Sequence, residues 1–239
     1  MNLKNTIRAT LIFLHLDLTK NLEYDRLTKK ILKQVLKQNS NCVDVGCHKG
    51  EILDEIIALA PNGKHFAFEP LPHLYQTLKH KYSGKATIYP FALSNKSGST
   101  TFNFVKNAPA YSGINKRKYD TATPDIEEIT VELNTIDAVL LNQKIDLIKI
   151  DVEGGEFGVL KGAEVLLKRD LPVVIFESGM GASDFYGTQP KDLYHFLNSD
   201  IGLKISTLKG FINKDKALDS ATFELYFNTN KEYYFIAHQ

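Results

Sequence analysis

The chain reads CVDVGCHKGE over residues 42–51, a short apolar segment followed by a turn that contains two glycines. The apolar segment predicts a β-strand over Cys42–Val45, and the residues after the turn predict a helix over Glu51–Leu59. The pattern continues with a strand, a helix and a further strand, at His65–Phe68, Pro72–Lys81 and Thr87–Tyr89. Strands and helices that alternate in this way are typical of βαβ units, so we expect a parallel sheet with helices on both faces.

Residues 94–133 interrupt this alternation, because they are polar and rich in turn-forming residues. We expect an insertion with strands at 100–105 and 129–133 that crosses the edge or the mouth of the sheet. The alternation then resumes with a strand, a helix and a strand, at residues 147–150, 157–167 and 173–176.

The last third of the chain changes character. A helix is expected at 191–197, and alternating apolar residues predict antiparallel strands at 203–208, 222–227 and 233–237. No internal repeat or Pro/Ser-rich linker divides the sequence, so we predict a single domain over residues 1–239. Within this domain we distinguish three parts from the central unit. They are a helical N-terminal extension (1–37), the insertion (94–133), and a C-terminal helix with antiparallel strands (179–239).

The composition is that of a globular protein and argues against some classes of partner. The chain has 239 residues, and its 29 Lys and Arg against 28 Asp and Glu leave a net charge of +1. A charge balance this even argues against a protein dedicated to nucleic acids, because such a protein needs a basic face.

Cysteine usage and the apolar segments bear on the cellular location. Cys42 and Cys47 are too few for a disulfide framework and are expected to be free thiols in a reducing compartment. The apolar run at 11–18 is too short to span a bilayer and is not followed by a cleavage site. We therefore expect no membrane span and a cytoplasmic location.

The glycine turn after the first strand is the first candidate site. Gly46 and Gly50 allow the backbone to turn sharply and to bring N–H groups close to a ligand. Glu69 ends the second strand, where a carboxylate can accept hydrogen bonds from both ribose hydroxyls of a nucleoside. The turn alone is equally compatible with a tight β-to-α connection, but together with Glu69 it favours a nucleoside site.

The second candidate site follows the strand at 147–150. Asp151, Glu153 and Glu156 lie within six positions of one another, and carboxylates gathered at a strand tip hold a cation, orient a substrate or share a proton. One of the two glutamates is expected only to favour the start of the next helix. Asp151 is therefore the main functional candidate.

Several segments of the sequence resemble the FkbM family of S-adenosylmethionine-dependent methyltransferases. They are the glycine turn, FEP, ALS and above all IDLIKIDVEGGE with VLKGA, at residues 44–50, 68–70, 92–94, 145–156 and 159–163. The resemblance extends from residue 38 to the C-terminus. The sequence departs from the family at Cys47 and His48, where Ala-Asn is more frequent.

The resemblance implies a doubly wound α/β fold: a mostly parallel, seven-stranded, Rossmann-like sheet with helices on both faces and an antiparallel last strand. It implies S-adenosylmethionine as the cofactor and a hydroxyl of a sugar, glycan or secondary metabolite as the methyl acceptor. The positions that it assigns to the cofactor are Asp44, Gly46, Cys47, His48, Gly50, Glu69, Pro70, Ala92, Leu93 and Asp151. It assigns Asp151 and Glu153 to the methyl-transfer site.

Methylation of a hydroxyl calls for a base or a metal ion, because the hydroxyl must lose its proton. Asp151 is the predicted base. Glu177 ends the neighbouring strand and could complete a cation site with Asp151, and His48 and His195 are further candidates. No metal is predicted, and the oligomeric state is left open.

Two other classes of protein are compatible with parts of the sequence. A nicotinamide-dependent oxidoreductase would use a similar turn and acid, but the expected glycine spacing and the Tyr-x-x-x-Lys pair are absent, since Pro190 follows Tyr186. A non-catalytic protein that keeps the nucleoside pocket is the second alternative. The predicted partner is a small-molecule or glycan hydroxyl acceptor, with a pocket shaped by residues 94–133 and 179–189.

Overall fold

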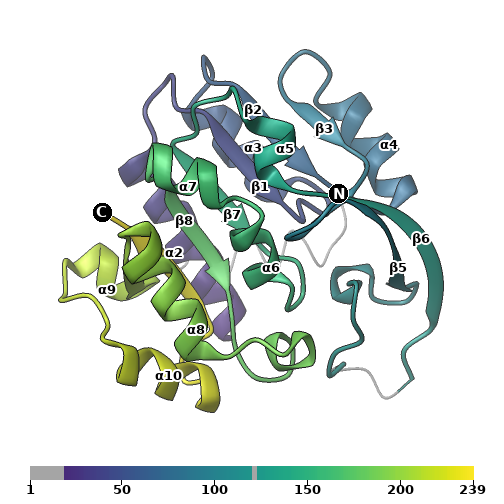
Figure 1. Ribbon diagram of the computed structural model, residues 1–239. Helices are drawn as coiled ribbons and strands as arrows, with labels where there is room; N and C mark the ends of the chain where they lie inside the picture. The colour runs from purple at the N-terminus through teal and green to yellow at the C-terminus, as the bar shows by residue number, and fades with distance from the viewer. Residues whose placement is uncertain (1–18, 120–122) are drawn as a thin grey trace.

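The computed structural model describes residues 19–119 and 123–239. Its main feature is a seven-stranded sheet in the order β3-β2-β1-β7-β8-β10-β9 (Figure 1). The strands are β1 (Cys42–Val45), β2 (His65–Phe68), β3 (Thr87–Tyr89), β7 (Leu147–Ile150), β8 (Val173–Glu177), β9 (Lys204–Thr207) and β10 (Tyr234–His238). All neighbouring strands run parallel except β10, which is antiparallel to both β8 and β9. The predicted mostly parallel sheet with an antiparallel last strand is confirmed.

Helices cover both faces of this sheet. One face carries α5 (Ile136–Leu140), α6 (Glu156–Lys161), α7 (Glu164–Asp170), α8 (Pro190–His195) and α10 (Ser220–Thr229). The other face carries α2 (Lys20–Val35), α3 (Glu51–Leu59), α4 (Pro72–Lys81) and α9 (Leu208–Asn213). Because both faces are covered, the central strands β1 and β7 are buried along their whole length rather than on alternate positions.

Two polar residues interrupt the apolar sequence of these two strands. Val43, Val45, Ile148 and Ile150 belong to the core beneath α5 to α8. Asp44 and Lys149 alternate with them and therefore point to the opposite face, and they are partners in the register of β1 and β7. Both are buried, so this register places a carboxylate and an ammonium side by side inside the sheet.

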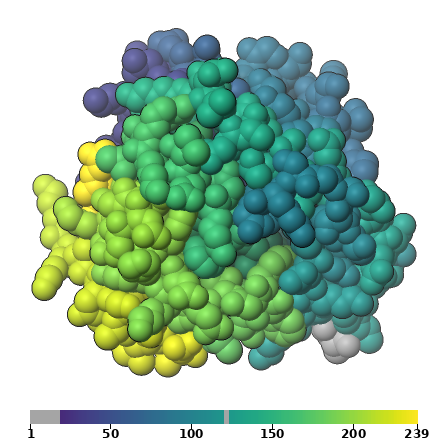
Figure 2. All heavy atoms as spheres, in the orientation of Figure 1, coloured from purple at the N-terminus to yellow at the C-terminus, as the bar shows by residue number. Residues whose placement is uncertain are grey.

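The insertion and the short strand directly before it form a second, three-stranded sheet in the order β4-β6-β5. Its strands are β4 (Ala92–Leu93), β5 (Gly98–Val105) and β6 (Ile126–Asn134), of which β5 and β6 pair antiparallel. A short 3-10 helix, η1 (Pro109–Tyr111), follows β5. The chain beyond η1 reaches the segment after β8, where Lys118 donates its N–H to the Gly181 carbonyl at 3.0 Å. Figure 2 shows these teal and green segments meeting on the face in view.

The predicted strand at 222–227 is wrong, because this segment lies in α10. Asp219 caps the helix and accepts a hydrogen bond of 2.8 Å from the N–H of Thr222. Phe223 and Phe227, four positions apart, are buried, whereas Leu225 between them is 53% exposed. The alternation of these three apolar residues suggested a strand, but the buried pair has the spacing of a helix.

Other elements also differ in extent from the prediction. The strands expected at 100–105 and 129–133 are longer, as β5 and β6. The helix expected at 157–167 is divided into α6 and α7, because the Asp137 carboxylate accepts hydrogen bonds of 2.9 Å from the N–H groups of Val165 and Leu166 and so starts a new helix. The strand expected at 203–208 ends at Thr207, whose hydroxyl caps α9. The helix expected at 191–197 continues beyond α8 as a π-helical turn, η3 (Phe196–Ile201).

The N-terminal extension is described only from residue 19 onward, so the apolar run at 11–18 lies outside the described residues. Within the described part, α2 packs against β10 and α9 through Tyr24, Leu27 and Ile31. Among the helices of residues 19–119 and 123–239, none has the length and apolar character needed to cross a membrane.

Candidate functional site

Two cavities, of about 310 and 820 Å³, lie at the carboxyl ends of the central strands. The smaller cavity has apolar walls that include Phe91, Leu93 and Phe157. The larger cavity is more polar and extends toward α2, β10 and the insertion. Five residues line both cavities: Gly46, His48, Ala110, Asp151 and Glu153. The two cavities therefore meet at the turns that follow β1 and β7, the place where open α/β sheets bind ligands.

The glycine turn after β1 fits closely against the turn after β7. Gly46 has a φ of +74°, and a Cβ at this position would lie 1.9 Å from the carbonyl oxygen of Asp151. No other residue type fits there without movement of the backbone. Gly46 thus allows the two candidate sites of the sequence to come into contact.

Glu69 holds the glycine turn from the end of β2. Its Oε2 accepts a hydrogen bond of 3.0 Å from the N–H of His48, and its Oε1 accepts one of 2.9 Å from the N–H of Leu71. Glu69 is buried and lines the smaller cavity. Burial raises the pKa of Glu69 to about 7. Because a carboxylate oxygen can accept more than one hydrogen bond, both oxygens keep capacity for donors of a ligand.

Asp44 is a buried carboxylate that accepts no hydrogen bond from the described part of the chain. Only 1% of it is exposed, and neither oxygen has a hydrogen-bond partner among the described residues. The nearest cation, Nζ of Lys149, lies 3.8 Å from Oδ1. Burial raises the pKa of Asp44 to about 6. A buried acceptor of this kind is costly unless a donor satisfies it, so Asp44 is suited to a cationic or N–H group of a ligand.

Asp151 is held by two residues of the protein. Its Oδ2 lies 3.1 Å from Nζ of Lys149 and accepts a hydrogen bond of 2.7 Å from the Tyr234 hydroxyl. Although burial acts in the opposite direction, Lys149 and Tyr234 lower the pKa of Asp151. Asp151 is therefore a stable anion at neutral pH, with weak affinity for a proton.

The two glutamates of the turn after β7 have different surroundings. Glu153 adopts a left-handed backbone (φ +60°) and forms an ion pair with Arg117 of the insertion. Glu156 is fully buried at the start of α6, and its Oε1 accepts hydrogen bonds from the N–H groups of Val152 and Gly154, at 2.9 and 3.1 Å. Burial raises the pKa of Glu156 to about 7. Glu156 thus shapes the turn, whereas Glu153 lines the cavities.

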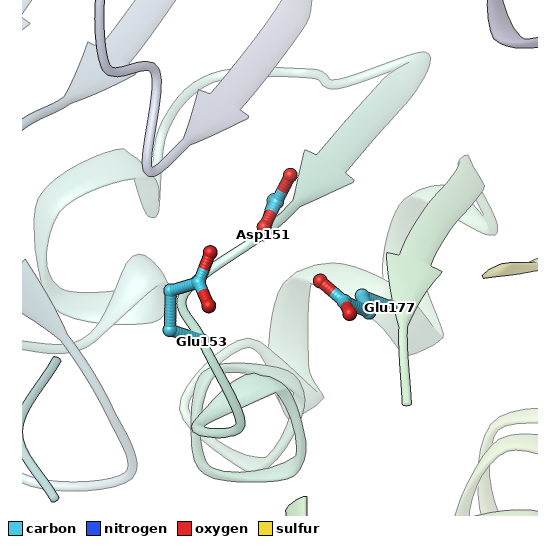
Figure 3. A group of neighbouring side chains, drawn as sticks. All are labelled: Asp151, Glu153 and Glu177. Carbon is cyan, nitrogen blue, oxygen red and sulfur yellow. The ribbon is translucent and has the colours of Figure 1, made fainter. Parts of the chain in front are cut away.

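Glu177, at the end of β8, brings a third carboxylate to the point where the cavities meet. Asp151, Glu153 and Glu177 point toward one another (Figure 3), and each offers an oxygen that lies within 4.8 Å of the others. Lys149 already faces Asp151, and Arg117 already faces Glu153. For Glu177, no hydrogen-bond or ionic partner is found within residues 19–119 and 123–239. Two of the three carboxylates thus have a cationic partner from the protein.

Most of the residues assigned from sequence line one of the cavities. Those at the smaller cavity are Gly46, His48, Glu69, Pro70, Ala92, Leu93 and Asp151. Asp44 and Cys47 line the larger cavity, whereas Gly50 lines neither and instead begins α3, with its carbonyl bound to the Tyr82 hydroxyl. His195 lies at the end of α8, where it is exposed and 3.5 Å from Asp200, and it has no place in either cavity.

Three residues that the sequence analysis did not select belong to this site: Lys149, Arg117 and Tyr234. Lys149 could have been found, because a charged residue in the middle of an apolar, buried strand is unusual. Arg117 and Tyr234 come from the insertion and from the end of the sheet, and no local pattern marks either of them.

A family model described as "Methyltransferase FkbM domain" matches residues 44–204. The methyltransferase sdnD of Sordaria araneosa is 28% identical over a region that covers 54% of this chain and 62% of the relative, so the chain matches less than two thirds of that protein. The crystal structure of methyltransferase FkbM from Methylobacillus flagellatus KT has a TM-score of 0.54 at 15% identity, over 85% of this chain and 44% of that chain. At this identity the likeness concerns the fold.

Proposed function

The chain belongs to the FkbM methyltransferase family, and we propose that it transfers a methyl group from S-adenosylmethionine to a hydroxyl of a sugar, glycan or secondary metabolite. When bound, S-adenosylmethionine supplies a methyl group carried on a positively charged sulfur. The protein has to hold this group next to the acceptor, exclude water and receive the proton that the acceptor loses.

The observation that carries this proposal is the buried carboxylate of Glu69 in the lining of the smaller cavity. Two backbone N–H groups fix its position, and its remaining acceptor capacity suits the two hydroxyls of a ribose. The apolar walls at Phe91, Leu93 and Phe157 suit an adenine ring. We assign the smaller cavity to the nucleoside part of the cofactor.

The residues at the junction fit the methionine part of S-adenosylmethionine. The two unsatisfied oxygens of Asp44 would accept hydrogen bonds from its ammonium group. Asp151 and Glu153 line both cavities and would attract the positive sulfur. The cofactor would therefore reach from the smaller cavity to the junction, with Asp151 beside the methyl group.

The larger cavity is the proposed acceptor site. Its lining contains tyrosines, asparagines and charged side chains from β10, α2 and the insertion, which suit an acceptor with several hydroxyls. Residues 110–111, 117–118 and 179–182 contribute to this lining. This supports the proposal that the insertion and the segment after β8 shape acceptor preference. With a net charge of +1, a small molecule or a glycan is a better acceptor than a nucleic acid.

Calorimetry and product release test the proposal in two steps. We expect the protein to bind S-adenosylmethionine and S-adenosylhomocysteine but not NAD; binding of NAD alone would indicate an oxidoreductase instead. Release of S-adenosylhomocysteine with a panel of sugar hydroxyl acceptors would then separate an enzyme from a protein that binds the nucleoside without turnover.

A further inference from the structure

We propose that Glu177 is the catalytic base, the group that takes the proton from the acceptor hydroxyl as the methyl group is transferred. This inference rests on the proposed function and replaces Asp151, the base expected from sequence. The hydroxyl oxygen forms a bond to the methyl carbon while the carbon–sulfur bond breaks and leaves its electron pair on sulfur. The hydroxyl proton moves to the Glu177 carboxylate, which becomes a neutral acid and later releases the proton to water.

The first argument is the position of Glu177 relative to the two cavities. Asp151 and Glu153 line both cavities, whereas Glu177 lines only the larger one. The three carboxylates converge at the junction (Figure 3). Glu177 is therefore the member of this group that lies on the acceptor side alone.

The second argument is which carboxylate is free to take a proton. Oδ2 of Asp151 is engaged by both Lys149 and Tyr234, and Oε2 of Glu153 is engaged by Arg117. Protonation of either carboxylate would weaken an ion pair. Glu177 has no such partner in the described part of the chain, so it can gain or lose a proton without breaking a hydrogen bond or an ion pair.

The third argument is the electrostatic environment of Glu177. Burial, together with the charges of Asp151 and Glu156, raises the pKa of Glu177 well above its usual range. The cations Arg117 and Lys149 act in the opposite direction with smaller effect. The ionisable groups that face Glu177 come from the insertion, β7 and its turn, α6 and β10: Arg117, Lys149, Asp151, Glu153, Glu156 and Tyr234. A carboxylate with a raised pKa is the stronger base once it is ionised.

The variant Glu177→Gln tests the role by activity, with Glu164→Gln, an exposed glutamate of α7, as the control. S-adenosylhomocysteine release is measured with methyl α-D-glucopyranoside, methyl β-D-galactopyranoside and methyl α-L-rhamnopyranoside as acceptors. We expect Glu177→Gln to bind S-adenosylmethionine normally in calorimetry and to transfer methyl groups about 10²–10⁴-fold more slowly than wild type. Transfer within a few fold of wild type would overturn the proposal, whereas a wild-type protein that does not bind S-adenosylmethionine in calorimetry would contradict the proposed function itself.

The pH profile separates a base from a residue that only supports the site. In wild type, kcat/KM should rise with pH as Glu177 loses its proton, and Glu177→Gln should remove this rise. Asp151→Asn should instead shift the rise to lower pH, because the charge of Asp151 contributes to the raised pKa of Glu177. A rise that persists unchanged in Glu177→Gln would exclude Glu177 as the base.

Thermal unfolding tests the titration of Glu177 without turnover. A folded-state pKa above the unfolded value of about 4.3 means that stability decreases as pH rises from that value. We therefore expect the difference in Tm, Glu177→Gln minus wild type, to increase from pH 5 to pH 8. Glu164→Gln should show no such increase. A Tm difference that does not change with pH would contradict the proposed titration.

Discussion

The hydroxyl of Tyr234 donates a hydrogen bond of 2.7 Å to Oδ2 of Asp151, so the antiparallel strand β10 supports a carboxylate that follows the parallel strand β7. Lys149 reaches the same oxygen from within β7. The position and the charge of Asp151 are thus fixed by two strands that lie far apart in the sequence.

Removal of the Tyr234 hydroxyl should destabilise the fold at neutral pH. We expect Tyr234→Phe to lower the free energy of unfolding by about 1.5–3 kcal/mol, because a hydrogen bond to a charged acceptor is lost. Urea unfolding at pH 7 measures this loss. The pKa of Asp151 is lower in the folded state than in the unfolded state. The ionised Asp151 carboxylate therefore stabilises the fold at pH values above its unfolded-state pKa, and this stabilisation is lost as pH falls from that value through the folded-state pKa. Tyr75→Phe is the control, because the Tyr75 hydroxyl on α4 has no hydrogen bond to any described residue. An equal loss in both variants would contradict the prediction.

A Gly→Ala substitution at Gly46 has two costs: the steric conflict with the turn after β7, and the left-handed backbone. Comparison with Gly84 separates these two costs. Gly46 and Gly84 have similar φ angles, +74° and +73°, but a Cβ at Gly84 meets no atom within 4 Å. We expect Gly84→Ala to cost about 1–2 kcal/mol for its left-handed backbone, and Gly46→Ala to cost more. Only Gly46→Ala should also weaken binding of S-adenosylmethionine, as measured by calorimetry. Equal costs would mean that the turn can move away from Asp151.

Glu69 should make cofactor affinity dependent on pH. Its carboxylate, with a pKa of about 7, accepts ribose hydrogen bonds best when ionised, so affinity for S-adenosylmethionine should increase from pH 6 to pH 8. Glu69→Gln should reduce this increase. Glu69→Ala should weaken binding of S-adenosylmethionine by about 1.5–3 kcal/mol. Calorimetry of a folded Glu69→Ala protein with unchanged affinity would remove Glu69 from the cofactor site.

Asp151→Asn should affect both turnover and stability. The variant removes a negative charge beside the proposed methyl group and leaves the buried ammonium of Lys149 with Asp44, at 3.8 Å, as its nearest carboxylate. We expect slower methyl transfer and a loss of about 1–3 kcal/mol in the free energy of unfolding. Activity and urea unfolding are measured on the same preparation. Wild-type activity in a well-folded variant would exclude Asp151 from the mechanism.

Much of the central sheet could be predicted from sequence, because its signals are local. The predicted bounds of β1, β2, β3 and β7 agree with the structure, since each is a short apolar run between turn-forming residues. The glycine turn and Glu69 could also be placed, because both follow directly from strand ends. At α10 the local signal was ambiguous, and burial of Phe223 and Phe227 decided in favour of a helix.

The environment of each carboxylate could not be predicted in the same way. In the sequence, Asp151, Glu153 and Glu177 are all acids near strand ends, and no local pattern shows which of them has a cationic partner. Their differences arise from Tyr234 and Arg117, which lie far along the chain from the residues they contact. Which acid is anchored and which is free is therefore a property of the tertiary structure.

The position of β10 has a consequence for how the molecule is made. β10 follows β8 and β9 along the chain but lies between them in the sheet. On the ribosome, β8 and β9 are therefore synthesised before the strand that joins them, and the edges of β8 and β9 that pair with β10 stay unpaired until β10 emerges. A nascent chain carries the glycine turn and Glu69 long before it carries Tyr234. The support of Asp151 is thus among the last parts of the site to form, and a chain arrested before β10 has the proposed cofactor residues without the completed junction.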